Sequence, residues 1–202
     1  LYLVITTSVS VGIIIGASLM YIVKNKPEHG TNSPSQITQA IQPETMSINP
    51  DADHHLVAVM DVEFLGYSQE LPKLMWLAKQ RGLIRLDPIF TFKSPRGRRM
   101  LQALYCGVLR KQDQSLLEDL LHGKKSPSYL FHVDQDGCHQ NQASEQYVLR
   151  VAKTVDASVD GPLPAFFLNG RLLQYRAETL ITDVEEAIKE GDIRCASLNA
   201  YF

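Results

Sequence analysis

The chain has 202 residues, 45% of them hydrophobic, which is enough apolar material to bury one good core. Its formal net charge of −2 provides no field that recruits nucleic acid or anionic lipid, so we expect no nucleic-acid partner. The chain has three cysteines and no Cys-x-x-Cys sequence, which argues against a disulfide scaffold and against a structural zinc site.

Residues 1–23 contain no Asp, Glu, Lys, Arg or His. As a helix they would extend about 34 Å, which is sufficient to cross a bilayer core. A cleaved signal peptide is the alternative, but its apolar core would be about 7–15 residues long and would precede small residues. This run ends instead in Leu-Met-Tyr-Ile-Val, so we predict one retained transmembrane helix over residues 1–23, in contact with the lipid bilayer.

Small residues recur at every fourth position of this segment, at Ser8, Gly12 and Gly16. Such a face lets two helices approach closely, which makes it a candidate for transmembrane packing in a homo-oligomer. The alternative is a monomeric anchor in which glycine is merely tolerated, and the pattern does not choose between the two.

The segment that follows, residues 24–52, is rich in proline and in polar residues. It has too little apolar surface to fold by itself, so we predict an extended linker or stalk. A folded domain is expected over residues 53–192, followed by a C-terminal tail over residues 193–202.

The first strand of that domain is predicted over Leu56–Leu65, an almost uninterrupted apolar run. A helix follows it, with Ser68 as the candidate cap and Pro72 in the first turn. The next predicted strand, residues 83–92, contains Pro88. Because proline cannot donate to a ladder, it indicates an edge strand or a break.

Residues 96–155 show apolar stripes at helical spacing. Cys106 falls on or beside one stripe, which predicts a buried side chain. Cys138 lies in a predicted loop and Cys195 in the tail, where they could pair with each other, link to a partner chain or stay free. The polar group around Cys138, namely His132, Asp134 and His139, matches no zinc or calcium loop, so we expect no metal ion.

The last part of the domain is predicted as strand, turn, strand and helix. An apolar run over residues 163–168 enters through Gly161-Pro162-Leu163-Pro164. Asn169-Gly170 then signals a hairpin turn, and apolar residues resume directly after it. An amphipathic helix is predicted over residues 180–189.

This Gly-x-x-Pro entry, the aromatic strand, the Asn-Gly-Arg turn and the closing helix resemble the last third of a thioredoxin-like domain. The chain resembles in particular the Dsb disulfide oxidoreductases and isomerases of the bacterial envelope, and Ala-Leu-Tyr-Cys at residues 103–106 also resembles their first inserted helix. The resemblance implies an α/β thioredoxin-like domain with a helical insertion at about residues 96–155. It also implies a cis Leu163–Pro164 bond facing the site where that family holds its redox cysteines.

The family carries Cys-x-x-Cys where the first strand passes into its helix, and this chain has no cysteine there. Gln69 and Pro72 fall about where the two thiols would be, so we expect no catalytic residue and no cofactor. The resemblance leaves a peptide- or partner-binding surface formed by Tyr67, Ser68, Gln69, Leu163, Pro164 and Ala165.

These features together suggest a redox-inactive scaffold or protein-binding subunit of an envelope assembly, with secretion and conjugation systems as settings by analogy. Lys24 and Lys26 taken alone would place their side of the span in the cytoplasm, whereas the resemblance favours a single-pass inner-membrane protein with a periplasmic domain. Two alternatives stay open. One is a thiol-disulfide oxidoreductase or isomerase that uses Cys138 or Cys195, and the other is a span that does the work itself by pairing through Gly12 and Gly16.

Overall fold

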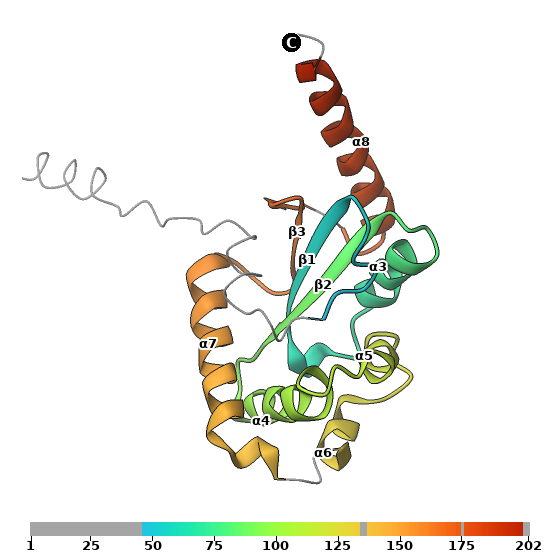
Figure 1. Ribbon diagram of the computed structural model, residues 1–202. Helices are drawn as coiled ribbons and strands as arrows, with labels where there is room; N and C mark the ends of the chain where they lie inside the picture. The colour runs from blue at the N-terminus through green and yellow to red at the C-terminus, as the bar shows by residue number, and fades with distance from the viewer. Residues whose placement is uncertain (1–45, 134–136, 175, 200–202) are drawn as a thin grey trace, which may run out of the picture. The chain divides into compact units, whose positions relative to one another are not determined.

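A four-stranded mixed sheet, in the order β2-β1-β3-β4, forms the centre of the fold in the computed structural model (Figure 1). The structure describes residues 46–133, 137–174 and 176–199, all of which belong to one compact unit. The predicted membrane helix, with Ser8, Gly12 and Gly16, lies outside these residues. Within them, no helix combines the length and the apolar character needed to cross a bilayer.

The two longest strands, β1 (His54–Asp61) and β2 (Ile84–Thr91), pair in parallel. The helix α3 (Glu70–Lys79) lies between them in the chain and connects them. The strand β3 (Ala165–Leu168) runs antiparallel to β1 and turns at Asn169 and Gly170 into the short β4 (Arg171–Leu172). The hairpin predicted from Asn-Gly is therefore confirmed. Asn169 and Gly170 both have positive φ, at 48° and 84°, which is the conformation that this turn chemistry favours.

Helices cover both faces of the sheet (Figure 1). On one face α3 packs against α8 (Leu180–Asn199), and α7 (Gln142–Ser158) covers the other face against β2. The apolar stripes predicted for these helices supply the core, because Leu71, Leu74, Val148, Val151 and Val184 are all fully buried.

The predicted helical insertion lies between β2 and β3. It begins with α4 (Pro95–Leu104), where the Ser94 hydroxyl accepts a hydrogen bond from the Gly97 N–H at 2.9 Å. The remaining elements are the π-helical turn η2 (Tyr105–Leu109), α5 (Gln114–Leu121), η3 (Pro127–Tyr129), α6 (Leu130–Val133), η4 (Cys138–Gln140) and then α7.

The packed core begins before residue 53, the expected start of the domain. Met46 and Ile48 are buried, and Ile48 exchanges two backbone hydrogen bonds of 2.9 Å with Leu86. The last residues of the predicted linker therefore add an antiparallel bridge to the outer side of β2. The position of β2 at the edge of the named strands agrees with the expectation from Pro88, which needs no ladder hydrogen bond there.

One disulfide closes the insertion, between Cys106 in η2 and Cys138 in η4. Cys106 is buried, as predicted, but the pairing considered for Cys138 with Cys195 is not what the structure shows. The Cα atoms of Cys106 and Cys138 lie 5.8 Å apart, within the usual range for a disulfide, although 32 positions separate them in the sequence. The side chain of Cys195 lies outside the described residues.

Candidate functional site

The strand register brings the proline of the Gly-x-x-Pro entry to the end of β1. Ala165 is paired with Val59, so Pro164, one residue earlier on the antiparallel strand, lies beside Met60. The Leu163–Pro164 peptide bond is cis, which confirms the prediction from the resemblance. Pro164 thus lies next to Asp61, the residue at which β1 ends.

A tight turn follows β1 and brings two aromatic side chains into solvent. The Asp61 carboxylate accepts a hydrogen bond of 2.9 Å from the Glu63 N–H, which starts the 3-10 helix η1 (Val62–Phe64). Phe64 and Tyr67 are 58% and 76% exposed. Large aromatic side chains this exposed at the end of a sheet are typical of contact surfaces.

The start of α3 lies directly after this turn. The helix begins at Glu70 and its cap position is Gln69, whose side chain makes no capping hydrogen bond. Ser68, the predicted cap, makes the capping contact, since its hydroxyl oxygen accepts a long hydrogen bond of 3.4 Å from the Leu71 N–H and the hydroxyl donates to the Glu70 carboxylate at 2.7 Å. The Gln69 side chain is exposed and makes no capping hydrogen bond at the helix start.

A cavity of about 340 Å³ opens where these segments meet. Its lining includes Tyr67, Ser68, Gln69 and Pro164 of the predicted surface, together with residues that the sequence did not indicate: Met60, Asp61, Phe64 and Glu70. Leu163 is half-buried beside it, whereas Ala165 is buried in β3 and does not line it.

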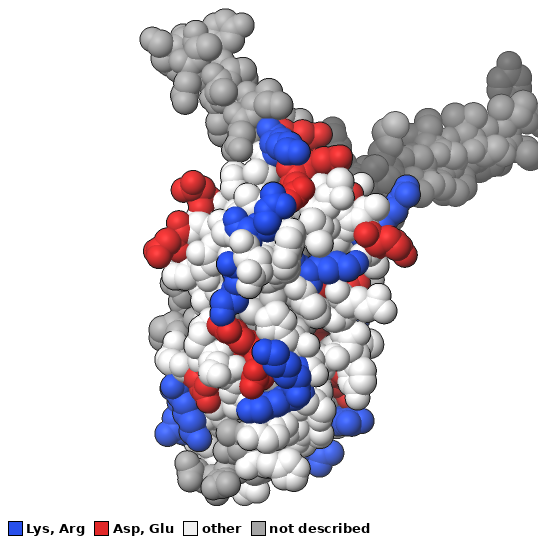
Figure 2. Space-filling view, turned by 90° about the vertical axis from the view of Figure 1, so that its right-hand side faces the viewer, with Lys and Arg blue, Asp and Glu red and all other residues white. Residues whose placement is uncertain are grey.

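The charge of the cavity lining is one-sided. Asp61 and Glu70 contribute two carboxylates, and no Lys, Arg or His is among the described residues that line the cavity. By contrast, the face of the molecule drawn in Figure 2 carries acidic and basic side chains interspersed, without a broad patch of one sign.

Among the described residues that line this cavity there is no cysteine, and the sulfur atoms of Cys106 and Cys138 form their own disulfide. The cavity lining therefore offers no thiolate for disulfide exchange. Of the polar group around Cys138, Asp134 lies outside the described residues, and the structure places the Cys138 sulfur in the disulfide.

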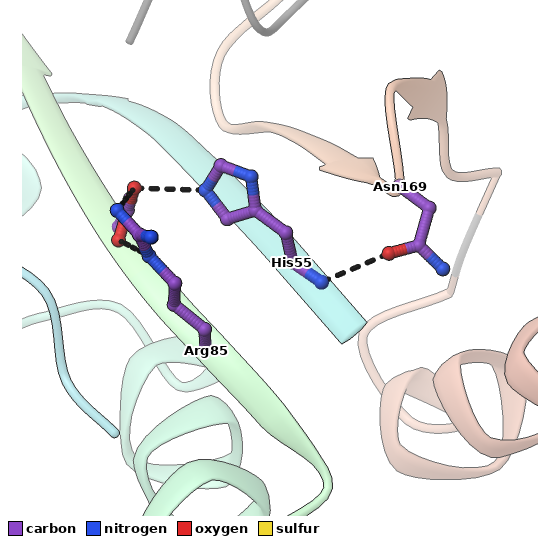
Figure 3. Close-up of polar contacts among 4 residues, drawn as sticks. His55, Arg85 and Asn169 are labelled. Carbon is purple, nitrogen blue, oxygen red and sulfur yellow. Dashed lines mark hydrogen bonds and ion pairs between the residues drawn. The ribbon is translucent and has the colours of Figure 1, made fainter. Parts of the chain in front are cut away.

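A second polar cluster lies at the opposite end of β1 (Figure 3). The His55 ring contacts the Asp87 carboxylate at 2.8 Å, and the Arg85 guanidinium donates two hydrogen bonds of 3.0 Å to the same group. The backbone N–H of His55 donates to the Asn169 side-chain oxygen at 2.9 Å. Burial alone would raise the pKa of Asp87, but hydrogen bonds from His55, Arg85 and Ser47 lower it to about 2. Both carboxylate oxygens of Asp87 accept hydrogen bonds, so this cluster links β1 to β2.

Comparison with known proteins supports the architecture. The structure resembles ScsC of Proteus mirabilis in a transitional conformation, with a TM-score of 0.59 at 16% identity over 93% of each chain. It also resembles a periplasmic thioredoxin-like protein from Salmonella enterica serovar Typhimurium, with a TM-score of 0.55 at 16% identity, over 74% of this chain and 94% of that one. For the thiol-disulfide exchange protein alpha-DsbA2 from Wolbachia pipientis the TM-score is 0.56 at 14% identity, over 76% and 92%.

No family model matches the sequence, and neither does any curated protein. The structural comparisons identify a thioredoxin-like fold with a helical insertion, similar to that of the DsbA and ScsC disulfide oxidoreductases at low sequence identity. They leave the chemistry of the site to be argued from its own residues.

Proposed function

We propose that this chain is a membrane-anchored, redox-inactive thioredoxin-like protein that holds an extended protein segment beside the cis-proline. It would serve as a scaffold or protein-binding subunit of a bacterial envelope assembly. The observation that carries the proposal is the cavity at Pro164, with exposed aromatic side chains and an unpaired stretch of backbone at its edge.

The unpaired backbone belongs to Leu163. In the described part of the chain, neither its N–H nor its C=O takes part in a hydrogen bond. An extended segment laid against Leu163 would satisfy both groups, which is the logic of strand addition in peptide recognition. Phe64 and Tyr67 would then contact its side chains, since both line the cavity and are largely exposed.

An envelope location is supported by the disulfide, because such bonds persist in oxidising compartments. The Salmonella protein of similar fold is periplasmic by its description. The anchor rests on the uncharged residues 1–23, and oligomerisation through Ser8, Gly12 and Gly16 is part of the same proposal. Secretion and conjugation machines are the settings that the analogy with disulfide isomerases suggests.

Binding of an unfolded protein tests the proposal. Fluorescently labelled, reduced and carboxymethylated ribonuclease A has no thiols and presents extended backbone. It therefore reports binding of an unfolded chain without thiol-disulfide exchange. The full chain is expected to raise its fluorescence anisotropy, and Tyr67→Ala should weaken binding about tenfold by removing an exposed aromatic contact. Leu149→Ala, on the exposed side of α7, is the matched control and should bind normally. Binding that is absent, or that is unaffected by Tyr67→Ala, would contradict the proposal.

The alternative function, disulfide exchange by cysteines at a non-standard position, is favoured by one contact. The Arg110 guanidinium lies 3.3 Å from the Cys138 sulfur, where it would stabilise a thiolate. Against it, Cys106 and Cys138 are only 2% and 6% exposed, so a substrate thiol has little access. Insulin reduction with dithiothreitol distinguishes the two functions: catalysis above background that is lost in Cys138→Ser would establish the alternative.

A further inference from the structure

We propose that the cavity selects a segment carrying a lysine or arginine side chain, which enters beside Pro164 and pairs with Asp61 and Glu70. This inference rests on the proposed function and names the partner chemistry of the same site. The occupant is an extended stretch of a partner protein with a basic residue at its centre.

The first argument is the uncompensated charge at the base of the cavity. Asp61 is only 3% exposed, and the one hydrogen bond of its carboxylate in the described structure is the one that Oδ1 accepts from the Glu63 N–H. A buried carboxylate is costly unless it is paired, and no ion pair within the described residues includes Asp61 or Glu70. A cation from the partner would supply the missing charge.

The second argument is the contrast with carboxylates elsewhere in the domain. Asp87 is held by His55 and Arg85, Glu118 by Lys79 and Glu145 by Arg98. The carboxylates of the cavity receive only neutral donors, a backbone N–H for Asp61 and the Ser68 hydroxyl for Glu70. Half-buried carboxylates such as Glu63 also receive only a neutral donor, so the contrast that matters is between the two buried ones: the fold pairs Asp87 with Arg85 and leaves Asp61 to a partner.

The third argument is the shape and chemistry of the walls. Met60 and Pro164 provide apolar surface for an aliphatic stem, and Phe64 and Tyr67 provide ring faces at the opening. Lysine and arginine bury their stems along such surface while the charged end finds a polar partner, and aromatic rings attract the cation. A volume of about 340 Å³ is near the lower end of the usual range for ligand cavities, which suits one or two side chains.

Three labelled peptides that differ only at a central position test the inference on the full chain. The position carries lysine, its uncharged isostere norleucine, or glutamate, within a flexible Val-Ala-Ser background. Fluorescence anisotropy should show the lysine peptide binding at least about fivefold more tightly than the norleucine peptide, and the glutamate peptide binding most weakly. The lysine preference should shrink as salt is raised from 50 to about 500 mM, since it is electrostatic.

Two variants assign the effect to the cavity. Glu70→Gln lies at an accessible helix start and should lower affinity for the lysine peptide about fivefold while leaving the norleucine peptide unchanged. Glu190→Gln, an exposed carboxylate on α8 that does not line the cavity, is the matched control and should change neither affinity. Asp61→Asn is a second test that keeps the side-chain shape.

The outcomes separate this inference from the proposed function. Equal binding of lysine and norleucine peptides that Tyr67→Ala still weakens would overturn the charge selection and leave peptide holding intact. Unchanged lysine preference in both Glu70→Gln and Asp61→Asn would also overturn it. If none of the peptides and no unfolded protein binds, both proposals fail.

Discussion

The ring of His55 on β1 lies 2.8 Å from the carboxylate of Asp87 on β2, so one half-buried contact joins the first halves of the two parallel strands. Arg85 completes the group from β2, and the Asp87 side chain is fully shielded from solvent. Because the partners come from different strands, this cluster contributes to tertiary stability.

Replacing Asp87 with asparagine should destabilise the fold by about 2 kcal/mol, because it removes a buried carboxylate that accepts hydrogen bonds from Arg85 and His55, whose side chains are 30% and 33% exposed. Urea unfolding followed by the fluorescence of Trp76, the only tryptophan, measures this change. Glu118→Gln is the control, since it disrupts a more exposed pair with Lys79 and should cost less than about 1 kcal/mol. Equal effects of the two substitutions would contradict the buried cluster's role.

The same carboxylate predicts a pH dependence. The folded-state pKa of Asp87 is lowered from 3.8 to about 2, so the unfolded chain binds this proton more readily than the folded chain does. Its contribution is therefore fully present above about pH 4 and is lost as the pH falls toward 2, with about 2 kcal/mol at stake. Unfolding free energies measured from pH 6 to 2 should converge for wild type and Asp87→Asn at the acid end. A constant difference across that range would refute this assignment.

The Cys106–Cys138 disulfide should stabilise the domain by about 3 to 4 kcal/mol, because it closes a loop of 32 positions in the unfolded chain. Dithiothreitol should lower the denaturation midpoint of the wild type and leave the Cys106→Ala/Cys138→Ala double variant unchanged. Equal sensitivity of both proteins to the reductant would show that this bond is not the source of the effect.

Gly66 allows the positive-φ turn that directly precedes the exposed Tyr67. Its φ is +84°, and a Cβ there would lie 3.3 Å from the Pro127 ring, so Gly66→Ala should cost about 1 to 2 kcal/mol for the backbone and also shift the turn. Gly82→Ala is the matched control, with φ of +64° and open space around the added carbon. Both should lose stability in urea unfolding, but only Gly66→Ala should also weaken binding of unfolded protein. Similar binding by both variants would argue against a role for the Tyr67 turn.

Local signals account for the parts of the fold that the sequence predicted. Asn169 and Gly170 fix a hairpin by backbone preference alone, and Pro88 marks an edge because it lacks an N–H. The cis bond before Pro164 was predictable only from the family resemblance, because a cis bond is uncommon even before proline.

The features that were missed depend on one local hydrogen bond that competes with the strand and on contacts distant in sequence. The apolar run of residues 56–65 reads as one strand, but the Asp61 carboxylate captures the Glu63 N–H and ends the strand at Asp61. That early end is what places Asp61 and Phe64 in the cavity lining. The pairing of Cys106 with Cys138 and the burial of Ile48 likewise require tertiary approach, which composition and periodicity do not report.

The bridge between Ile48 and Leu86 has a mechanical consequence. Its two backbone hydrogen bonds attach the incoming chain to β2, so tension applied upstream of Met46 reaches the outer strand before any helix. A force along that segment would act first on the hydrogen bonds between Ile48 and Leu86, before it reached the end of the sheet at Pro164. Under the proposed function, we therefore expect a bound segment to stay in place when the chain upstream of Met46 is under tension.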